Sequence, residues 1–407
     1  MTPSNSPLKI SFIVSDLSGG GAVRAFLLGQ VCKALGYRVE VVGFQSGPEL
    51  YAIPPDNMAV VSLPGAIYPQ FIAATRQLLA KLDGDILYAV KPKPSSFGVG
   101  LLKKWQTGRP LFLDMDDWEM SWHGGDEWRY RPPSLKQVYR DIFKSNGQLR
   151  QPDHPLYVKW LESMVAKADA LTVDTSFLQN RFGGVYVPNG KDTDLFDPTG
   201  YDGDRSRQKY GLSAYRVLMF PGAPRPHKGV EDVLMALEKL NQPDLRLVIV
   251  GGSPYDDYDE TLMAQWGHWI VKLPRCPVEQ MPEILAAAHV MVVPQRDTLT
   301  AQAQFPLKLT DGMAMGKPVL STRVGDIPDI LADSGYLVDP ESPDQLAAAI
   351  AHIFAHFDEA THRGQQGRIK CINHYSVTTM AQTLAQLLAV YDPCMAAPSL
   401  ASPHLSP

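Results

Sequence analysis

The chain has 407 residues, a formal net charge of −5, and 45% hydrophobic and 20% charged residues, which is typical of a globular protein with two domains or three. This acidic balance argues against bulk nucleic-acid binding, which needs a basic face. The N-terminal stretch lacks the basic and apolar regions of a signal peptide, and no apolar run reaches the roughly 18 residues of a membrane-spanning helix. Cysteines occur at scattered positions without metal-binding spacing (Cys32, Cys276, Cys371 and Cys394), so we expect a reducing cytoplasm.

Short apolar runs alternate with helix-length amphipathic segments along the first half of the chain. The expected strands are residues 9–14, 37–44, 59–64, 85–90, 110–115, 170–175 and 185–188, and the clearest helices are residues 22–36 and 68–82. The strand runs are almost continuously apolar rather than alternating, which is typical of parallel strands buried on both faces.

A second series of the same kind begins after residue 190, with expected strands at 216–222, 245–252, 269–274, 289–295, 318–322 and 335–339. Two serial βα sets predict an α/β protein of two Rossmann-like, doubly wound domains facing across a cleft. We expect an N-terminal domain over 1–190 and a C-terminal domain over 191–376, joined through the polar stretch 188–211. A last helix over about 377–392 precedes a Pro/Ser-rich tail, 393–407, that we expect to be disordered.

An insertion over about 125–160 interrupts the first series. Between residues 129 and 150 it has six basic residues and one acid, with aromatic residues interleaved (Arg129, Arg131, Lys136, Arg140, Lys144, Arg150; Asp141; Tyr130, Tyr139, Phe143). Such a segment can lie on an anionic membrane surface. The interpretation that we favour at this stage is a solvated helical insertion whose aromatic side chains pack on the domain.

The first glycine-rich loop, SDLSGGGAVRAF, follows the first strand and opens a helix. Glycines allow close backbone approach to a ligand, and a helix N-terminus favours an anion. A dinucleotide fingerprint would place a third glycine where this chain has Arg24, so a nicotinamide cofactor is not expected. Gly20 and Gly21 are therefore predicted to face a ligand, and the alternative is a plain tight turn.

The second loop, PGAPRPHKG, follows the first strand of the second series and carries Gly222, Arg225, His227 and Lys228. Cations at the start of a helix are normally disfavoured by the helix dipole. Their clustering is explained if they face a phosphate, and the alternative is a solvated basic turn.

The third loop, QAQFPLKLTDGMAMGKP over 302–318, contains a second anion-friendly helix start. Lys308 and the backbone amides of Leu307 and Lys308 are predicted to bind an anion there. Asp311, one turn further on, could accept hydrogen bonds from ribose hydroxyls or simply complement the helix dipole. All three loops follow strands, so we expect them at strand carboxyl ends lining an interdomain cleft.

Three acids follow the fifth strand, namely Asp114, Asp116 and Asp117. Carboxylates are ligands for hard cations, but the interpretation that we prefer is binding of sugar hydroxyls or action as an acceptor-side base. The alternative is that Asp117 caps the following turn.

In this order and spacing, the motifs resemble those of retaining GT-B glycosyltransferases of the "glycosyl transferases group 1" family, over about residues 8–392. The stretch 188–198, PNGKDTDLFDP, is similar to the family segment PNGVDxxxFxP. The two glycine loops resemble its phosphate-facing loops, and IVGGSP (249–254) resembles the strand end beside the nucleotide. The final helix resembles the one that crosses back to the first domain.

Departures from the family pattern lie in its E-x7-E segment. Ala303 stands where the first acid belongs and Asp311 where the second belongs. Phe305 and Leu307 match, and FPLKLTDGMAMGKPV fits a variant of the form FPxKLxEYMAxGKPV, whose lysine is Lys308. In the second loop Arg225 replaces an arginine that would directly follow Gly222, and near Asp116 family members often have a histidine.

The resemblance implies transfer of a hexosyl group, with retention, from a nucleotide diphosphate sugar to a carbohydrate, lipid-linked or small hydroxyl acceptor. It implies catalytic roles for Asp116, Lys228 and Arg225, and acceptor binding by Arg24 and Asp117. Donor-binding roles fall to Gly20, Gly21, Gly222, Phe305, Leu307, Lys308 and Asp311. No metal or cofactor is expected. The alternatives are a non-catalytic relative that partners an active transferase, and a GT-B nucleotide-sugar epimerase. The expected location is cytoplasmic, with peripheral contact at the inner membrane surface left open.

Overall fold

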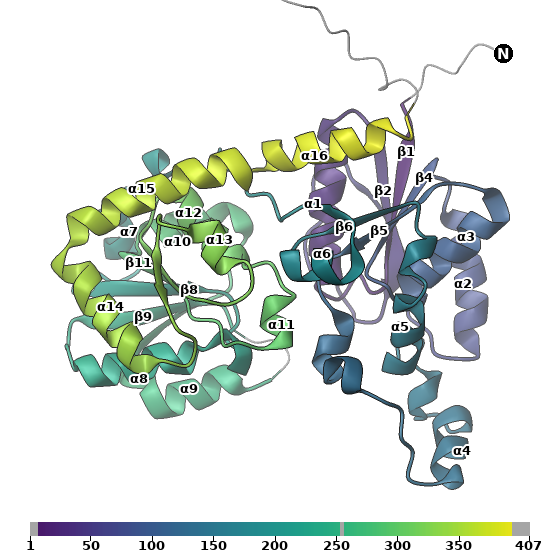
Figure 1. Cartoon of the computed structure of the whole chain (residues 1–407), viewed down its shortest axis with the longest axis horizontal. Coiled ribbons are helices and arrows are strands. Elements are labelled where there is room, and N and C mark those ends of the chain that lie inside the picture. The colour runs from purple at the N-terminus through teal and green to yellow at the C-terminus, as the bar shows by residue number, and fades with distance from the viewer. Residues whose placement is uncertain (1–6, 253–255, 393–407) are drawn as a thin grey trace, which may run out of the picture. The chain divides into compact units, whose positions relative to one another are not determined.

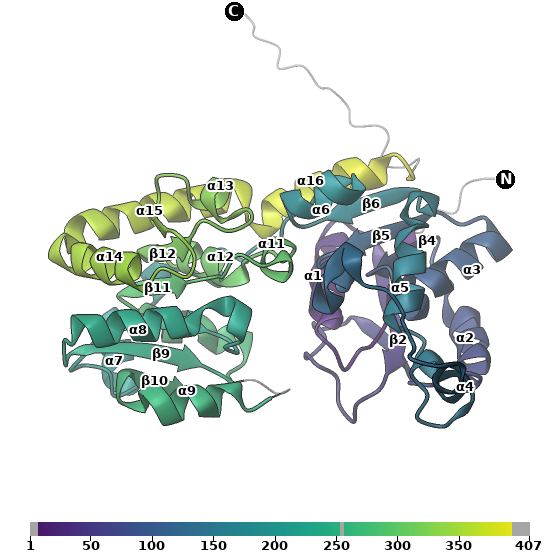
Figure 2. The ribbon, with the colours of Figure 1, turned by 60° about the horizontal axis from the view of Figure 1, so that its bottom comes forward.

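The computed structural model describes residues 7–252 and 256–392, and it divides into two compact units, each with its own sheet (Figures 1 and 2). Of the described residues, unit 1 contains 7–173, 182–187 and 380–392, and unit 2 contains 174–181 and 188–379. The expected disordered tail lies outside the described residues, as do the last two residues of the IVGGSP motif.

Unit 1 contains a seven-stranded parallel sheet in the order β3-β2-β1-β4-β5-β6-β7. Its strands are β1 (Lys9–Val14), β2 (Arg38–Gln45), β3 (Ala59–Pro64), β4 (Ile86–Val90), β5 (Leu111–Met115), β6 (Ala170–Val173) and β7 (Val185–Tyr186). Strands β4 and β5 are buried along their whole length, as expected for a sheet that is covered on both faces.

Helices cover both faces of this sheet, with α1 on one face and α2 and α3 on the other (Figure 2). The helices of this part of the chain are α1 (Gly21–Ala34), α2 (Gln70–Lys81), α3 (Val99–Thr107), α4 (Leu135–Phe143), α5 (Pro155–Glu162) and α6 (Ser176–Phe182), with the short turns η2 (Glu119–His123) and η4 (Gln148–Arg150). Within the core, the rings of Phe12 and Tyr88 stack at 4.9 Å, and the Tyr88 hydroxyl satisfies its hydrogen bond with Thr172 at 2.6 Å.

Unit 2 contains a six-stranded parallel sheet in the order β10-β9-β8-β11-β12-β13. Its strands are β8 (Arg216–Pro221), β9 (Leu245–Val250), β10 (Ile270–Leu273), β11 (Val290–Val293), β12 (Val319–Thr322) and β13 (Tyr336–Val338). Its helices are α7 (Gly203–Lys209), α8 (Val230–Leu240), α9 (Tyr258–Trp266), α10 (Met281–Ala286), α11 (Leu299–Gln302), α12 (Leu307–Ala314), α13 (Ile327–Leu331), α14 (Pro343–Ala355) and α15 (Phe357–His374), with the turn η7 (Pro226–Lys228). Helix α16 (Val377–Ala389) begins in unit 2 and continues in unit 1.

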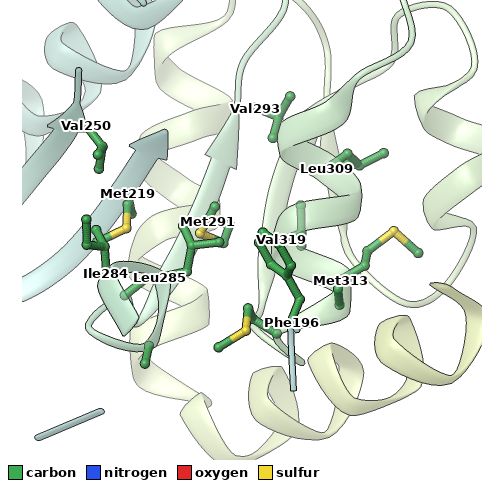
Figure 3. Close-up of a cluster of buried hydrophobic side chains, with 14 of the residues drawn as sticks. Phe196, Met219, Val250, Ile284, Leu285, Met291, Val293, Leu309, Met313 and Val319 are labelled. Carbon is green, nitrogen blue, oxygen red and sulfur yellow. The ribbon is translucent and has the colours of Figure 1, made fainter. Parts of the chain in front are cut away.

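Alternate residues of the unit 2 strands enter two separate cores. On β8, Val217 and Met219 belong to the core beneath α10 and α12, shown in Figure 3, whereas Leu218 and Phe220 belong to the core beneath α8 and α14. Because both faces are buried, every position favours an apolar side chain. This explains the continuous apolar runs from which the parallel strands were predicted.

Each sheet has a point at which the strand order reverses, between β1 and β4 in unit 1 and between β8 and β11 in unit 2. Ligands of open α/β sheets bind beyond the carboxyl ends of the strands at this position. The first glycine loop follows β1, and the second follows β8. Both loops that the sequence singles out therefore lie at the positions that the topology favours for binding.

Candidate functional site

The loop after β8 depends on two glycines for its path. Gly222 has a φ of 107° and Gly229 a φ of 65°, in the region that favours glycine. A Cβ on Gly229 would lie 1.8 Å from the carbonyl oxygen of Pro294, which no side chain can tolerate. The absence of a side chain at Gly229 thus allows the end of η7, which contains Lys228, to pack against the segment that follows β11.

The loop and the segment before α12 contact each other through two lysines. Lys228, within the loop, donates a hydrogen bond from its Nζ to Gln304 Oε1 at 3.1 Å. The Nζ of Lys308, from α12, lies 3.2 Å from where a Cβ on Gly222 would be, and 4.8 Å from the centre of the Phe220 ring. The structure thus brings Lys308 to a loop that already contains Lys228, from a segment far away in the sequence.

The electrostatic surroundings of this cluster are positive. Burial and, after it, the charges of Lys228, Arg225 and Lys308 together lower the pKa of His227 to about 3, so the imidazole is neutral at physiological pH. Burial also lowers the pKa of Lys308, with Arg225 adding to the effect and Asp311 opposing it. The contribution of the three neighbouring cations to the His227 shift indicates a local field that favours an anion.

Helix α12 begins beside this basic cluster. Of the two backbone amides that the sequence predicts to bind an anion there, that of Leu307 makes a local hydrogen bond. Pro306 is the N-cap residue of the helix, and the Leu307 N–H donates to the Phe305 carbonyl oxygen at 3.0 Å. That amide takes part in a local turn in this structure, and its predicted contact with an anion stays a prediction. The Leu307 side chain is exposed and that of Phe305 is buried.

Asp311 forms an ion pair with Lys191, which comes from the polar stretch that joins the two series. The Lys191 Nζ also lies 4.2 Å from the centre of the Phe196 ring. The pairing fixes the direction of the Asp311 carboxylate, while its predicted contact with a ribose stays a prediction. Ala303, at the place of the missing acid, is fully buried.

In unit 1 the glycine loop lies against Lys91, the residue after β4. Helix α1 begins at Gly21 with Gly20 as its N-cap, and a Cβ on Gly21 would lie 3.6 Å from the Lys91 Cε. Lys91 itself has a φ of 70°, an uncommon conformation that often marks functional positions.

Lys91 is surrounded by the carboxylates that follow β5. Its Nζ lies 2.7 Å from Glu119, 3.6 Å from Asp117 and 3.7 Å from Asp116, and Lys93 adds a second contact to Glu119 at 2.8 Å. The Asp117 carboxylate also accepts a hydrogen bond from the Trp122 indole at 2.8 Å. The structure therefore brings together Asp116 and Asp117, as predicted, with two lysines and a glutamate that the sequence analysis did not single out.

The pKa values in this cluster follow from burial and from a negative local field. Burial lowers the pKa of Lys91, but Asp116, Glu119 and Asp117 raise it more, so its pKa lies well above the usual value. Burial raises the pKa of Asp116, with Lys91 opposing. For Glu119 the two lysines outweigh burial and lower its pKa to about 2. Asp116 is thus the carboxyl of this cluster that exchanges a proton at a raised pH.

Arg24 and Asp114 form a buried pair rather than a ligand-binding surface. The Arg24 guanidinium donates to Asp114 through two hydrogen bonds of 3.0 and 2.9 Å and to the Val187 carbonyl oxygen at 2.8 Å. Both side chains are almost fully buried, and Thr172 donates a further bond to Asp114 at 2.7 Å. This burial argues against direct acceptor binding by Arg24, which instead ties α1 to β5 and to the segment after β7.

The two lysines that the sequence analysis missed do have a local signal. Lys91 and Lys93 occur in the stretch KPKP, directly after an apolar strand and at the same sheet edge as Asp116. Among the described residues, no group of three or more histidine, cysteine or acidic side chains is arranged to hold a metal ion. Nor does the described part of the chain contain a helix long and apolar enough to cross a membrane.

Two family models match this chain. The model for "Glycosyl transferase 4-like domain" matches residues 19–193, and the model for "Glycosyl transferases group 1" matches residues 215–356. Together the two matches indicate a glycosyltransferase of two domains, with the group 1 model on the second. The two matches fall on the two series of βα units, and they cover the glycine loops of both.

The curated proteins similar to this chain include glycosyltransferases. It is 28% identical over 238 residues to a GDP-mannose-dependent alpha-(1-6)-phosphatidylinositol monomannoside mannosyltransferase of Mycolicibacterium smegmatis, a match that covers 54% of this chain and 62% of that enzyme. It is 26% identical over 337 residues to MMP alpha-(1->4)-mannosyltransferase of Mycolicibacterium hassiacum, covering 80% of this chain and 75% of that enzyme.

Solved structures similar to this chain have the GT-B fold. The Anabaena protein HepE, in complex with UDP-glucose, superposes with a TM-score of 0.71 at 18% identity, covering 94% of this chain and all of that one. WaaG, a glycosyltransferase involved in lipopolysaccharide biosynthesis, superposes with a TM-score of 0.66 at 16% identity, covering 93% and 99%. These likenesses confirm the predicted fold of two Rossmann-like domains.

Proposed function

We propose that this protein transfers a hexosyl group from a nucleotide diphosphate sugar to a hydroxyl acceptor, with retention of anomeric configuration. The observation that carries the proposal is that Arg225, Lys228 and Lys308 all lie close enough to His227 to lower its pKa, in the loop where the strand order of unit 2 reverses. Their positive field suits the diphosphate of a donor, because negative charge grows on that group as the glycosidic bond breaks.

Donor binding in this proposal uses the glycine turn and the α12 segment. The close approach of Lys308 to Gly222 leaves a short distance between the cation and any phosphate lying on the turn. Gly20 and Gly21 would approach the donor from the first glycine loop, and Asp311, oriented by Lys191, would bind the ribose. Phe305 and Leu307 flank Lys308 and complete the predicted set.

The acceptor side of the proposal rests on the carboxylates after β5. Asp116 is half-buried and its pKa is raised by burial, which suits a group that accepts the proton of an acceptor hydroxyl. Asp117, held by the Trp122 indole, would bind a hydroxyl of the sugar or of the acceptor. If the leaving phosphate oxygen takes that proton instead, Asp116 only binds hydroxyls; no protein nucleophile is required in this route.

A non-catalytic role is the second candidate, and Ala303 favours it. If a carboxylate must contact the transferred sugar at that position, this chain has a buried methyl group in its place. The protein would then bind a nucleotide sugar as the partner of an active transferase. A nucleotide-sugar epimerase is a third outcome that the same experiment distinguishes.

The test is calorimetric titration of the full chain with GDP-mannose, UDP-glucose and other nucleotide sugars, followed by turnover with the donor that binds. Acceptors would include inositol phosphates and phosphatidylinositol mannosides, the classes named for its relatives. We expect transfer, with the anomeric configuration of the donor kept in the product by NMR. Donor binding without transfer to any acceptor would favour the non-catalytic role, and sugar conversion without acceptor would favour the epimerase.

A further inference from the structure

Helix α4, in the insertion of unit 1, is oriented opposite to a normal surface helix. Its apolar side chains face solvent, with exposed fractions of 88% for Leu135, 57% for Tyr139, 44% for Ile142 and 65% for Phe143. At about 100° per residue these four side chains, with the half-buried Val138, span an arc of about 140°. A helix that packed on its own domain would bury such an arc. An exposed apolar face of this kind therefore indicates binding to a partner outside the chain.

The side of α4 that faces the protein is its polar side. Asp141 is buried and accepts hydrogen bonds from the Tyr130 hydroxyl at 2.6 Å and from the Gln137 side chain at 2.8 Å. A Cβ on Gly147 would lie 2.3 Å from the Asp141 carbonyl oxygen, so the following turn closes tightly beneath the helix. Ser134 caps its N-terminus by accepting from the Gln137 N–H at 3.2 Å. Thus the orientation of α4 is fixed by specific polar contacts.

Basic side chains border the apolar arc along one edge. In helical projection, Lys136, Arg140 and Lys144 follow the arc over the next roughly 80°, and all three are exposed. Arg129 and Arg131, in the stretch of chain that leads into the helix, are exposed as well. The acid within this segment, Asp141, is the buried one, so between residues 129 and 144 the charges that face outward are positive, although the whole chain has a net charge of −5.

We propose that α4 docks the protein on an anionic membrane surface, with the apolar arc at the level of the lipid headgroups and acyl chains and the basic edge on lipid phosphates. The charge pattern decides between occupants. A second copy pairing through the same arc would add another basic edge and no opposite charge, whereas an anionic bilayer presents an apolar layer and anionic headgroups at once. Figure 1 shows α4 beyond α5 and away from the strands of unit 1.

The docking is expected to be reversible and sensitive to salt. A nine-residue helix inserts few apolar side chains, and stable anchoring generally needs a second signal such as a basic patch. Screening at high ionic strength removes the electrostatic part and leaves the apolar part largely in place. The proposal does not depend on the donor chemistry of unit 2, so it stands or falls separately from the proposed function.

The test is cosedimentation of the full chain with vesicles of phosphatidylcholine alone or mixed with phosphatidylglycerol. We expect at least about tenfold stronger partitioning onto the anionic vesicles, reduced between about 0.1 and 1 M salt. Two double variants, Tyr139→Ser/Phe143→Ser and Lys136→Glu/Arg140→Glu, should each lose at least about tenfold of that partitioning. Because these side chains are exposed, thermal unfolding should stay unchanged.

Matched controls come from exposed side chains of unit 2. Ile369→Ser/Ile372→Ser removes two exposed apolar side chains of α15, and Arg205→Glu/Arg275→Glu reverses two exposed charges; both should keep the partitioning of the unaltered chain. Equal partitioning onto the two kinds of vesicle, or undiminished binding by the α4 variants, would overturn the proposal. So would a dimer, seen by analytical ultracentrifugation, that the apolar α4 variant abolishes while vesicle binding is absent.

Discussion

Both units place lysines beyond the strand ends where the strand order reverses, but the two sets of lysines lie in opposite fields. In unit 1, Lys91 is surrounded by Asp116, Asp117 and Glu119, and its pKa is raised. In unit 2, burial and neighbouring cations lower the pKa values of Lys308 and His227. A lysine whose charge is matched within the protein mainly supports the fold, whereas clustered cations are set for an anionic ligand.

The comparison suggests a division of tasks. The field in unit 2 suits the diphosphate of a donor, and the carboxylates of unit 1 suit hydroxyl groups of a neutral acceptor. Substitutions in the two clusters should therefore change different measurements: stability and acceptor chemistry in unit 1, donor binding and the transfer rate in unit 2. Variants in the two units test this difference, and they are given in order of decreasing expected effect.

Arg24→Ala should lower the free energy of unfolding by about 3–5 kcal/mol, because it leaves the buried Asp114 carboxylate without its cation. Urea denaturation measures this loss. Arg205→Ala, at an exposed position of α7, serves as the matched control and should change the stability by less than about 0.5 kcal/mol. A stable Arg24→Ala variant would show that the unit 1 charges do not support the fold in the way that the contacts indicate.

Lys228→Ala should raise the transition-state barrier by about 2.7–4 kcal/mol, which is roughly a 10²- to 10³-fold loss of kcat/KM. Its folding free energy should hardly change, in contrast to that of Arg24→Ala. Lys239→Ala, which removes an exposed lysine of α8, should keep full activity. Unchanged kinetics in Lys228→Ala would contradict the assignment of a phosphate to this cluster.

Asp116→Asn should lower kcat by about 10²-fold, at the lower end of the range for a general base. A base acts in its deprotonated form, so in the unaltered protein kcat/KM should increase as the pH rises through the raised pKa of Asp116. This limb of the pH profile should be missing in the variant. If the variant keeps the limb, another group accepts the proton and Asp116 only binds hydroxyls.

His227→Gln should have the smallest effect, about 1 kcal/mol or less on donor binding at neutral pH. The low pKa of about 3 keeps the imidazole uncharged there, so its replacement removes at most a neutral hydrogen bond. Calorimetry with the binding donor, for this variant and for Lys228→Ala side by side, measures the difference. An equally large loss in both would mean that the imidazole is charged when the donor is bound.

Much of the fold could be predicted because parallel strands leave a local signal. Every strand of the described chain overlaps a predicted run, since burial on both faces makes these strands almost continuously apolar. The glycine loop after β8 was equally visible, because the positive φ values at Gly222 and Gly229 restrict the residue type. The sequence did not predict that residues 174–181 belong to unit 2, because this depends on contacts between residues that are distant in sequence.

The candidate sites were predicted less completely. Asp116 and Lys228 were singled out by their place after strands, but nothing near Asp311 in the sequence indicates its pairing with Lys191, a residue far earlier in the chain. Lys91 was missed because a lysine after a strand is common, and its importance appears only when the carboxylates of the next strand surround it. The local turn that the Leu307 amide makes beside the Pro306 N-cap was not predicted either, because it depends on the backbone path at that helix start.

The sequence by itself determined the two sheets, the order of their strands along the chain and the residue types that reach the strand ends. These follow from burial patterns and backbone restrictions, which act over a few residues. The tertiary structure alone decided that Arg24 faces Asp114, that Lys308 lies at Gly222, and that the apolar side of α4 faces outward. Such pairings depend on which distant segments come together and on the electric field that these segments create. Neither can be predicted from a local stretch of the chain.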